Sequence, residues 1–244
     1  MLENNIKQQF KKTINLEKLS YSDPYWLQTE GSLGMYNVNK RTLIGKPETP
    51  RKAVVFFNLL IDTTQLTIKK NIIHRYSKRD QGELYDPFEI VPLVTTKLND
   101  KVLLFSDANE QTVNVGVRSG ANNIKGKLFL DVPEEWKVTP TFIEIEIKQK
   151  GDTQTYPFKI TPTINDSEGV IKASVLVDGK KFDKELIEIK YDHIPKQTVL
   201  KKSEAKAVRL NIKKAGNFIG YIKGAGDLVP ESLKQIGYSV VMIN

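Results

Sequence analysis

Over most of its length the chain has the alternating apolar and polar pattern that is typical of β-strands. Between about residues 95 and 204, apolar-rich runs recur at the spacing of roughly 8–12 residues expected of a β-sandwich. These runs are VLLF, TVNVGVR, KLFLDV, FIEIEIKQ, PFKITP, VIKASVLV and LIEIKY. In FIEIEIKQ, Ile143, Ile145 and Ile147 alternate with Glu144 and Glu146, which indicates one buried and one solvated face.

The region before residue 95 has a weaker form of the same pattern. AVVFFNLLI (53–61) and LTIKKNIIH (66–74) are β-rich runs separated by DTTQ, which predicts a hairpin. Pro87 and Pro92 bracket FEIV and cannot donate to a sheet, so a domain boundary is expected at about residues 92–97. Before residue 21, Ile6, Phe10 and Ile14 recur at four-residue spacing, which favours a short amphipathic helix or a linker.

The spacing of apolar residues along the chain changes again after about residue 205. FIGYI and YSVVMI are apolar on both faces, as in parallel strands, and a short helical stripe separates them. Asp227 is a candidate N-cap, Pro230 suits the first turn, and Gly237 can end the helix in the left-handed conformation. Two parallel strands are not a stable sheet by themselves, so part of their surface is expected to face absent neighbours. The candidates for that uncovered face are Phe218, Tyr221, Val240 and Met242.

The predicted fold class is therefore mainly β, with two Ig-like β-sandwich domains in tandem followed by a partial α/β strand-helix-strand unit. The segments are an N-terminal helical or linker segment (1–20), a first sandwich (21–94), a second sandwich (95–204) and the incomplete α/β unit (205–244).

Composition narrows the function classes. Of the 244 residues, 39% are hydrophobic and 27% are charged, which is a globular composition, and no apolar run reaches the roughly 18 residues of a membrane-spanning helix. No membrane insertion is therefore expected. The net charge of +8 comes from lysines interleaved with acids, so solvated strand faces are favoured over a nucleic-acid surface. The absence of cysteine excludes disulfides, zinc–thiolate sites and cysteine nucleophiles.

Residues with catalytic potential are sparse. His74 and His193 lie far apart in sequence, and neither has a second ligand at helical spacing, so structural roles are favoured. Gly224, Gly226 and Asp227 lie between a strand and a helix, where backbone N–H groups can hold an anion. Val229 stands where the dinucleotide fingerprint has its third glycine, so close strand-to-helix packing is the favoured interpretation of this candidate anion-binding loop. No catalytic and no metal-binding residue is predicted.

Four aromatic residues are candidates for contacting a glycan: Tyr25, Trp26, Tyr36 and Trp136. A ring exposed on a sandwich face can stack on a sugar, which would make the chain an independent carbohydrate-binding module. The alternative for Trp136 is a place in the sandwich core, and for Tyr25 and Trp26 it is an anchor between domains. Both alternatives are favoured over glycan contact.

Several motifs, taken as a series, resemble those of large bacterial PIG-L (LmbE-like) deacetylases. DPYWLQTEGSLGMYNV, LIGKPETP and GELYDPFEIVPLV resemble the region downstream of their catalytic domain. GKLFLDVPEEWKVTP, the G-x-x-x-x-Y-P-F-K-I-T-P segment and YDHIPKQT resemble the β-sandwich that follows, which is similar to the domain associated with galactosidase carbohydrate-binding modules (NPCBM-associated). IGYIKGAGDLVPESLKQIGYSV resembles the opening of a flavodoxin-like or amidotransferase-like domain. The resemblance extends from about residue 20 to the end.

The resemblance implies an accessory region rather than an enzyme. The zinc site of the family uses a His-Pro-Asp-Asp motif and a later His-x-x-His, and this sequence contains neither. The expectation is a non-catalytic scaffold from a zinc-dependent N-acetylglucosaminyl deacetylase, with zinc in a missing upstream domain and most of an α/β domain missing downstream. Those domains are the expected partners, a glycan is a further candidate, and no nucleic acid is expected. No secretory signal is evident, and a periplasmic or cell-surface location is expected by analogy alone.

Overall fold

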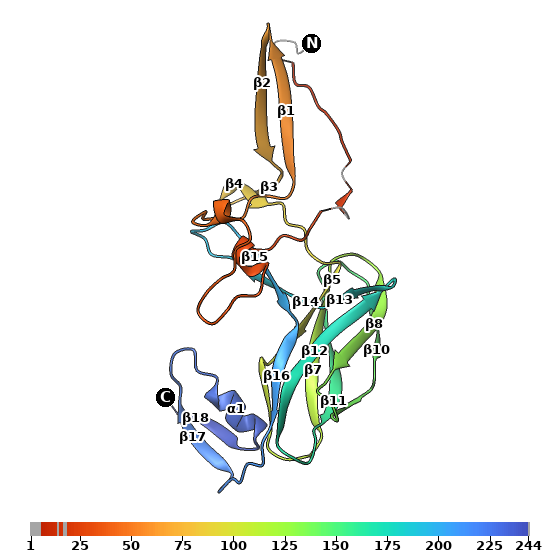
Figure 1. Ribbon diagram of the computed structural model, residues 1–244, viewed down its shortest axis with the longest axis vertical. Helices are drawn as coiled ribbons and strands as arrows, with labels where there is room; N and C mark the ends of the chain where they lie inside the picture. Colours follow the sequence, from red (N-terminus) through yellow and green to blue (C-terminus); the bar gives the residue numbers. More distant parts are fainter. Residues whose placement is uncertain (1–5, 14, 17–18, 244) are drawn as a thin grey trace. The chain divides into compact units, whose positions relative to one another are not determined.

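The computed structural model describes residues 6–13, 15–16 and 19–243. The chain divides into two compact units, one of residues 1–91 with 189–198 and the other of residues 92–188 with 199–244. Strands dominate both units (Figure 1), and α1 (Val229–Gln235) is the one α-helix among the described residues. The mainly-β class is therefore confirmed, whereas the four-part division of the chain stays a prediction. No helix in the described part of the chain is both long and apolar enough to cross a membrane.

The larger unit contains a β-sandwich of two sheets. One sheet has the order β10-β8-β12-β16-β6, with β13 paired to β12, and the other has the order β5-β7-β11-β9. Within these two sheets, the pairings with a described register are antiparallel, apart from the parallel pair of β16 and β6. The strands are β5 (Val94–Leu98), β6 (Val102–Phe105), β7 (Gln111–Ser119), β8 (Ile124–Asp131), β9 (Lys137–Thr139), β10 (Ile143–Ile147), β11 (Thr153–Thr161), β12 (Ser167–Val177), β13 (Lys180–Phe182) and β16 (Glu204–Arg209).

Alternation along each strand builds the sandwich core. In β10, Ile145 and Ile147 are buried while Glu144 and Glu146 are exposed, as the sequence predicts. The largest fully buried side chains come from both sheets, so the two layers share one apolar interior. They include Phe105, Phe158, Leu98, Leu128, Ile147, Ile160 and Ile171.

The turn between β12 and β13 shows how local sequence sets the register of these strands. Asp178 and Gly179 both have positive φ, at 48° and 76°, as the two central residues of a type I′ turn require. Val177 and Lys180 flank the turn and pair directly across the hairpin.

The smaller unit differs from its prediction. Its strands form two separate two-stranded antiparallel sheets, β1 with β2 and β3 with β4, and the sandwich predicted for residues 21–94 is not formed by the described residues. A sandwich needs a second sheet to cover the apolar face of the first, and neither hairpin is extended by another strand. The elements are the 3-10 helices η2 (Tyr25–Leu27) and η3 (Arg41–Leu43), and the strands β1 (Val54–Ile61), β2 (Thr64–Asn71), β3 (Ile73–Lys78) and β4 (Gly82–Pro87).

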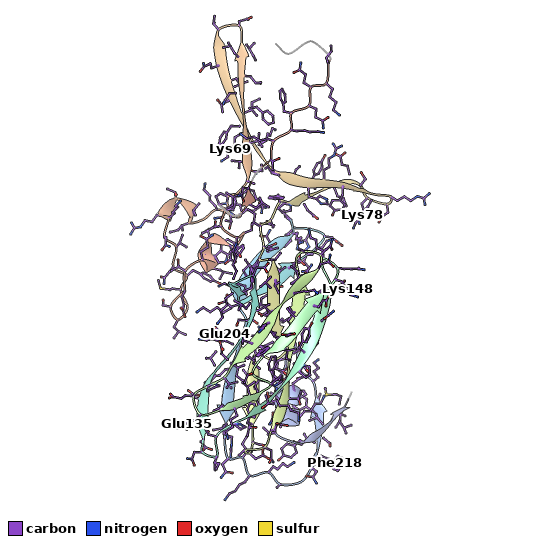
Figure 2. The ribbon with its side chains drawn as sticks, turned by 90° about the vertical axis from the view of Figure 1, so that its right-hand side faces the viewer. Lys69, Lys78, Glu135, Lys148, Glu204 and Phe218 are labelled. Carbon is purple, nitrogen blue, oxygen red and sulfur yellow. The ribbon has the colours of Figure 1, made fainter. Side chains whose placement is uncertain are left out.

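The hairpin β1–β2 has an apolar face that remains accessible. Lys69 of β2 and Lys78 at the end of β3 mark the two hairpins in Figure 2. Phe57 pairs with Ile68 and Leu59 pairs with Leu66, so these four side chains share one face. Phe57 is nevertheless 44% exposed. The turn is tighter than the four residues suggested by the sequence, because Ile61 and Thr64 already pair.

The helix proposed for the N-terminal segment is not formed by the described residues 6–13, which have no regular secondary structure. Ile6 and Phe10 are exposed there, and Ile14, the third residue of the proposed apolar stripe, lies outside the described residues. A further two-stranded sheet joins β14 (Lys184–Ile189) to β15 (Gln197–Lys202), and residues 189–198 belong to the smaller unit.

The last part of the larger unit is the strand-helix-strand unit. β17 (Phe218–Ile222) and β18 (Ser239–Ile243) pair in parallel, with α1 between them in sequence. The helix ends as predicted: Gly237 has a φ of 90°, and the N–H of Tyr238 bonds the carbonyl of Leu233 at 3.0 Å, as in a Schellman motif. The flavodoxin-like identity of this unit stays a prediction.

The apolar surface of this unit differs in detail from the predicted one. Phe218 is 79% exposed, and Ile222, Val241 and Ile243 are exposed on the same face of the strand pair. Tyr221 and Val240 were expected on that face too. They alternate onto the other face instead and are half-buried, and Met242 alternates with them.

Candidate functional site

The candidate site lies on the loop between residues 23 and 44 of the smaller unit, and Tyr25 anchors it. Its ring is buried, its hydroxyl donates to the carbonyl of Lys46 at 3.1 Å, and its N–H donates to the Thr49 hydroxyl at 2.9 Å. The Trp26 indole meets this ring edge to face, with ring centroids 4.8 Å apart. Tyr25 is thus a fixed support for the neighbouring indole, and its own ring is not presented to solvent.

A second set of contacts ties the start of the loop to the end of the unit. The Ser22 N–H donates to the carbonyl of Ile90 at 2.7 Å, and the Ile90 N–H donates to the Ser22 hydroxyl at 2.9 Å. Nearby, the Arg51 guanidinium pairs with Glu48 at 2.8 Å and with Glu89 at 2.6 Å. Such charge-assisted bonds, together with the reciprocal pair, hold residues about 68 positions apart in one place.

The loop itself turns back on itself just beyond Trp26. The N–H of Ser32 bonds the carbonyl of Met35, and the N–H of Met35 bonds the carbonyl of Ser32, both at 3.1 Å. Gly34 at the tip has a φ of 77°, a conformation that favours glycine. A Cβ on Gly31 would stand 2.5 Å from the Met35 carbonyl oxygen, so only glycine fits there without a shift. This tight turn places Met35 and Tyr36 side by side on the accessible side of the loop.

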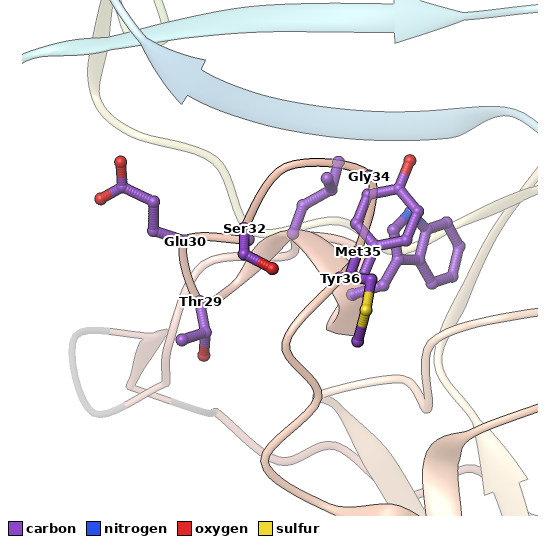
Figure 3. Close-up of a pocket in the computed structure, with 9 residues that line it drawn as sticks. Thr29, Glu30, Ser32, Gly34, Met35 and Tyr36 are labelled. Atoms are coloured by element: carbon purple, nitrogen blue, oxygen red, sulfur yellow. The ribbon is translucent and has the colours of Figure 1, made fainter.

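Two shallow pockets flank this turn. Figure 3 shows one of them, the pocket that includes Thr29, Glu30 and Ser32 in its lining. One has a volume of about 450 Å³ and includes Glu30 and Ser32 among its lining residues; the other has about 680 Å³ and includes Asn37 and Arg41. Trp26, Gly34, Met35 and Tyr36 line both. Tyr36 is 66% exposed and Trp26 is half-buried, so aromatic surface lies next to a carboxylate, a hydroxyl and a guanidinium.

Trp136, the fourth predicted aromatic, lies elsewhere and is enclosed. It is 6% exposed within the sandwich core, edge to face with Phe105 at a centroid distance of 4.9 Å. Its indole N–H donates to the Ser167 hydroxyl at 3.1 Å, so its one polar atom is also satisfied. The ring is therefore not available to stack on a glycan. Trp136 lies in the sandwich core, which was the favoured alternative for this residue.

The loop with Gly224, Gly226 and Asp227 is arranged around a carboxylate of the chain itself. One Asp227 oxygen accepts the N–H of Val229 at 2.9 Å, and the other accepts the Tyr221 hydroxyl. The Tyr221 bond is the main cause that holds the pKa of Asp227 below its ordinary value, with backbone bonds from Val229 and Gly224 adding to it. An external anion would have to displace this carboxylate from the loop's donors.

The structure also revises the predicted cap of α1. The N-cap is Leu228 rather than Asp227, and Asp227 contributes from one position earlier by accepting the Val229 N–H. Pro230 lies in the first turn as predicted. With seven residues, α1 is too short to offer a strong dipole at its N-terminus.

The remaining ionisable side chains are dispersed. Within residues 6–13, 15–16 and 19–243, no three His, Asp or Glu side chains form a group that could hold a metal ion. His74 stacks on Tyr76 at a centroid distance of 5.3 Å, and His193 stacks on Tyr191 at 5.8 Å.

Sequence reasoning selected the aromatic members of the loop but missed their neighbours. Met35, Glu30 and Arg41 line the pockets beside Trp26 and Tyr36, and no spacing rule singles them out. The two glycines that bracket Ser32 and Leu33 were the available signal, because such a pair marks a tight turn next to Tyr36.

Comparison with known proteins adds little to this geometry. No protein family and no curated protein matches the chain. Among solved structures 31 chains match, including WR4, a Caenorhabditis elegans member of the MSP family. WR4 is 9% identical, the alignment covers 48% of this chain and 98% of that one, and the TM-score is 0.27. A similarity at this level carries no argument about fold or function.

Proposed function

We propose that this chain is a non-catalytic accessory region of a zinc-dependent N-acetylglucosaminyl deacetylase of the PIG-L family, and that its 23–44 loop contacts glycan. The support for the parent enzyme is the ordered series of motifs, from DPYWLQTEGSLGMYNV to IGYIKGAGDLVPESLKQIGYSV. The support for glycan contact is one observation: Trp26 and Tyr36 line the same two shallow pockets beside hydrogen-bonding side chains.

The chemistry of the pockets suits a pyranose ring. Sugars present an apolar C–H face, which packs against an aromatic ring, and a rim of hydroxyls, which need hydrogen-bond partners. Tyr36 supplies an accessible ring, and Glu30, Ser32 and Arg41 supply polar groups around it. The buried Tyr25 holds the Trp26 indole in place, which lowers the entropy cost of ordering the site.

Calorimetric titration with oligosaccharides of N-acetylglucosamine tests the glycan contact. Tyr36→Ala is expected to weaken binding roughly tenfold, because removing an aromatic contact costs on the order of 1–2 kcal/mol. The matched control is Tyr191→Ala, which removes a similarly exposed tyrosine that lines neither pocket. Flat traces with the unaltered chain, or equal losses in both variants, would contradict the proposed contact.

The accessory role has its own test. With zinc added, this chain alone is expected to release no acetate from N-acetylglucosaminides, and the adjacent upstream coding sequence is expected to contain a His-Pro-Asp-Asp motif. Robust turnover by the chain, or an upstream sequence of another family, would overturn the parentage and leave the glycan contact to be judged by titration.

A further inference from the structure

The larger of the two pockets on the 23–44 loop combines three kinds of surface, and its volume of about 680 Å³ lies in the usual range for small-molecule sites. Tyr36 supplies an aromatic ring. Met35 and Ile44 supply apolar side chains, which are 69% and 63% exposed. Asn37 adds an amide and Arg41 adds a guanidinium. A ligand in this pocket therefore meets a ring, an apolar surface and two polar groups together.

The Asn37 side chain has a fixed orientation because one end of its amide is already bound. Its Nδ2 donates to the carbonyl of Glu30 at 2.7 Å. That bond determines which way the amide is turned, so the Oδ1 atom is left as an acceptor. Within the described part of the chain, no donor engages this oxygen. Asn37 can therefore accept a hydrogen bond from a ligand.

Arg41 offers donors to complement that acceptor. Its guanidinium has five N–H groups and a permanent positive charge. Among the residues that the structure describes, none forms an ion pair or a hydrogen bond with this guanidinium, whereas Arg51 is paired with both Glu48 and Glu89. Arg41 is also the one charged residue in the described lining of this pocket, since Glu30 lines the other pocket.

These groups match the acetamido substituent of an amino sugar. An acetamido group has a carbonyl oxygen that accepts a hydrogen bond, an N–H that donates one, and an apolar methyl group. Arg41 can donate to the carbonyl, Asn37 can accept from the N–H, and Ile44 can contact the methyl group. A deacetylated sugar has an ammonium group in the same place, which accepts no hydrogen bond and is repelled by the Arg41 charge.

We propose that the larger pocket binds the acetamido group of an N-acetylated amino sugar and that Arg41 disfavours the deacetylated form. The inference rests on the proposed glycan contact of the 23–44 loop. It adds which sugar is held: the substrate of an N-deacetylase rather than its product. Selectivity of this kind is a difference between two affinities, and a repulsive charge contributes to it as much as an attractive contact does.

Calorimetric titration of the full chain with tetramers of N-acetylglucosamine, glucosamine and glucose tests this selectivity, at a pH at which the sugar amine is protonated. The acetylated tetramer is expected to bind roughly tenfold more tightly than the glucosamine tetramer. Arg41→Met is expected to reduce that ratio to about threefold or less, because the donors and the repulsive charge are both lost. The matched control is Arg79→Met, which removes an exposed arginine that lines neither pocket and is expected to leave the ratio unchanged.

Saturation-transfer NMR with the acetylated tetramer examines the methyl contact separately. The acetyl methyl group is expected to receive the strongest saturation, and Ile44→Ser is expected to weaken that signal and to lower the affinity roughly threefold. The glucose tetramer has no methyl group, so its affinity is expected to stay the same. Ile164→Ser is the matched control, since Ile164 is 82% exposed and lines neither pocket.

The outcomes separate this inference from the proposed function. Equal affinity for the acetylated and deacetylated tetramers, or a ratio that survives Arg41→Met, would overturn the acetamido proposal and leave the glycan contact in place. Failure of all three tetramers to bind the unaltered chain would overturn both.

Discussion

The hairpin β1–β2 and the strands of the sandwich have the same local pattern but different environments. In β1, Val55, Phe57, Leu59 and Ile61 lie on one face, which is at least as apolar as the buried face of β10. The β10 isoleucines at 145 and 147 are nevertheless buried, while most of the β1 face is exposed. The difference comes from the second sheet, which the sandwich has and the hairpin lacks. Apolar alternation therefore specifies a strand but does not say what covers it.

The largest expected effect is a difference in lost stability between a substitution in the sandwich core and one in the hairpin. Phe158→Ala empties a fully buried site between the two sheets and is expected to lower the free energy of unfolding of the sandwich by about 3–5 kcal/mol. Phe57→Ala in the hairpin is expected to cost less than about 1 kcal/mol, because 44% of the Phe57 surface is already exposed to water.

Tryptophan fluorescence during urea denaturation measures this contrast. The chain has two tryptophans, and in a Trp26→Phe background Trp136 alone reports on the sandwich. Hydrogen exchange of the β1–β2 amides covers the hairpin, where protection is expected to be lower than in β12. Similar losses for Phe57→Ala and Phe158→Ala would mean that the hairpin face is covered in solution.

A smaller expected effect tests whether burial also determines how much an ion pair contributes to stability. The Glu185 carboxylate is 3% exposed and bonds the half-exposed Lys101 ammonium. Lys101→Met leaves this carboxylate buried without its partner and is expected to destabilise the sandwich by roughly 2 kcal/mol. Lys206→Met breaks an exposed pair with Glu168 in the same unit and is expected to cost less than about 0.5 kcal/mol. Equal costs, measured by the same fluorescence assay, would show that solvent screens both pairs alike.

The smallest effect concerns pH in the α/β unit. The hydrogen bond from Tyr221 to Asp227 lowers the pKa of Asp227 and raises that of Tyr221. Because the pKa of Asp227 is lowered in the folded state, its ionised carboxylate stabilises the fold at pH values above 3.8, the ordinary pKa of this group. This contribution is lost as the pH falls through the folded-state pKa. Because the pKa of Tyr221 is raised in the folded state, its protonated hydroxyl stabilises the fold at pH values below 10.0, the ordinary pKa of this group. This contribution is lost as the pH rises through the folded-state pKa.

Tyr221→Phe tests this coupling. The pKa of Asp227, followed by the NMR shift of its carboxyl carbon, is expected to move up toward 3.8 when the hydroxyl is removed. The apolar sandwich core contains no such pair, so its exchange rates are expected to be unaffected. An Asp227 pKa that is identical in both proteins would show that the backbone donors alone set its value.

Much of the sandwich was predictable because its information is local. The alternating runs, the Asp178-Gly179 turn and the left-handed Gly237 were all evident in the sequence, since side-chain period and positive φ depend on neighbouring residues. β5, β13 and β16 were missed. Residues 94–98 of β5 fall at the expected domain boundary, KKF is too short to show a period, and EAKAVR buries small alanines rather than large side chains.

The candidate site was likewise only partly predictable from the sequence. Tyr25, Trp26 and Tyr36 were chosen as rings expected on a sandwich face, but they lie on a loop outside the sandwich sheets. The sequence also did not reveal that the Tyr25 ring is buried and the Tyr36 ring is exposed. That distinction depends on Lys46 and Thr49, some twenty residues away, which hold Tyr25 inward.

By itself, the sequence determined where most of the strands form, how several of them turn, and which faces are apolar, because each of these properties is encoded within a few residues. Only the tertiary structure decided which apolar faces are covered and that Trp136 is enclosed. Those outcomes depend on contacts between segments far apart in the chain, where the close packing of whole layers, rather than local preference, selects the partners.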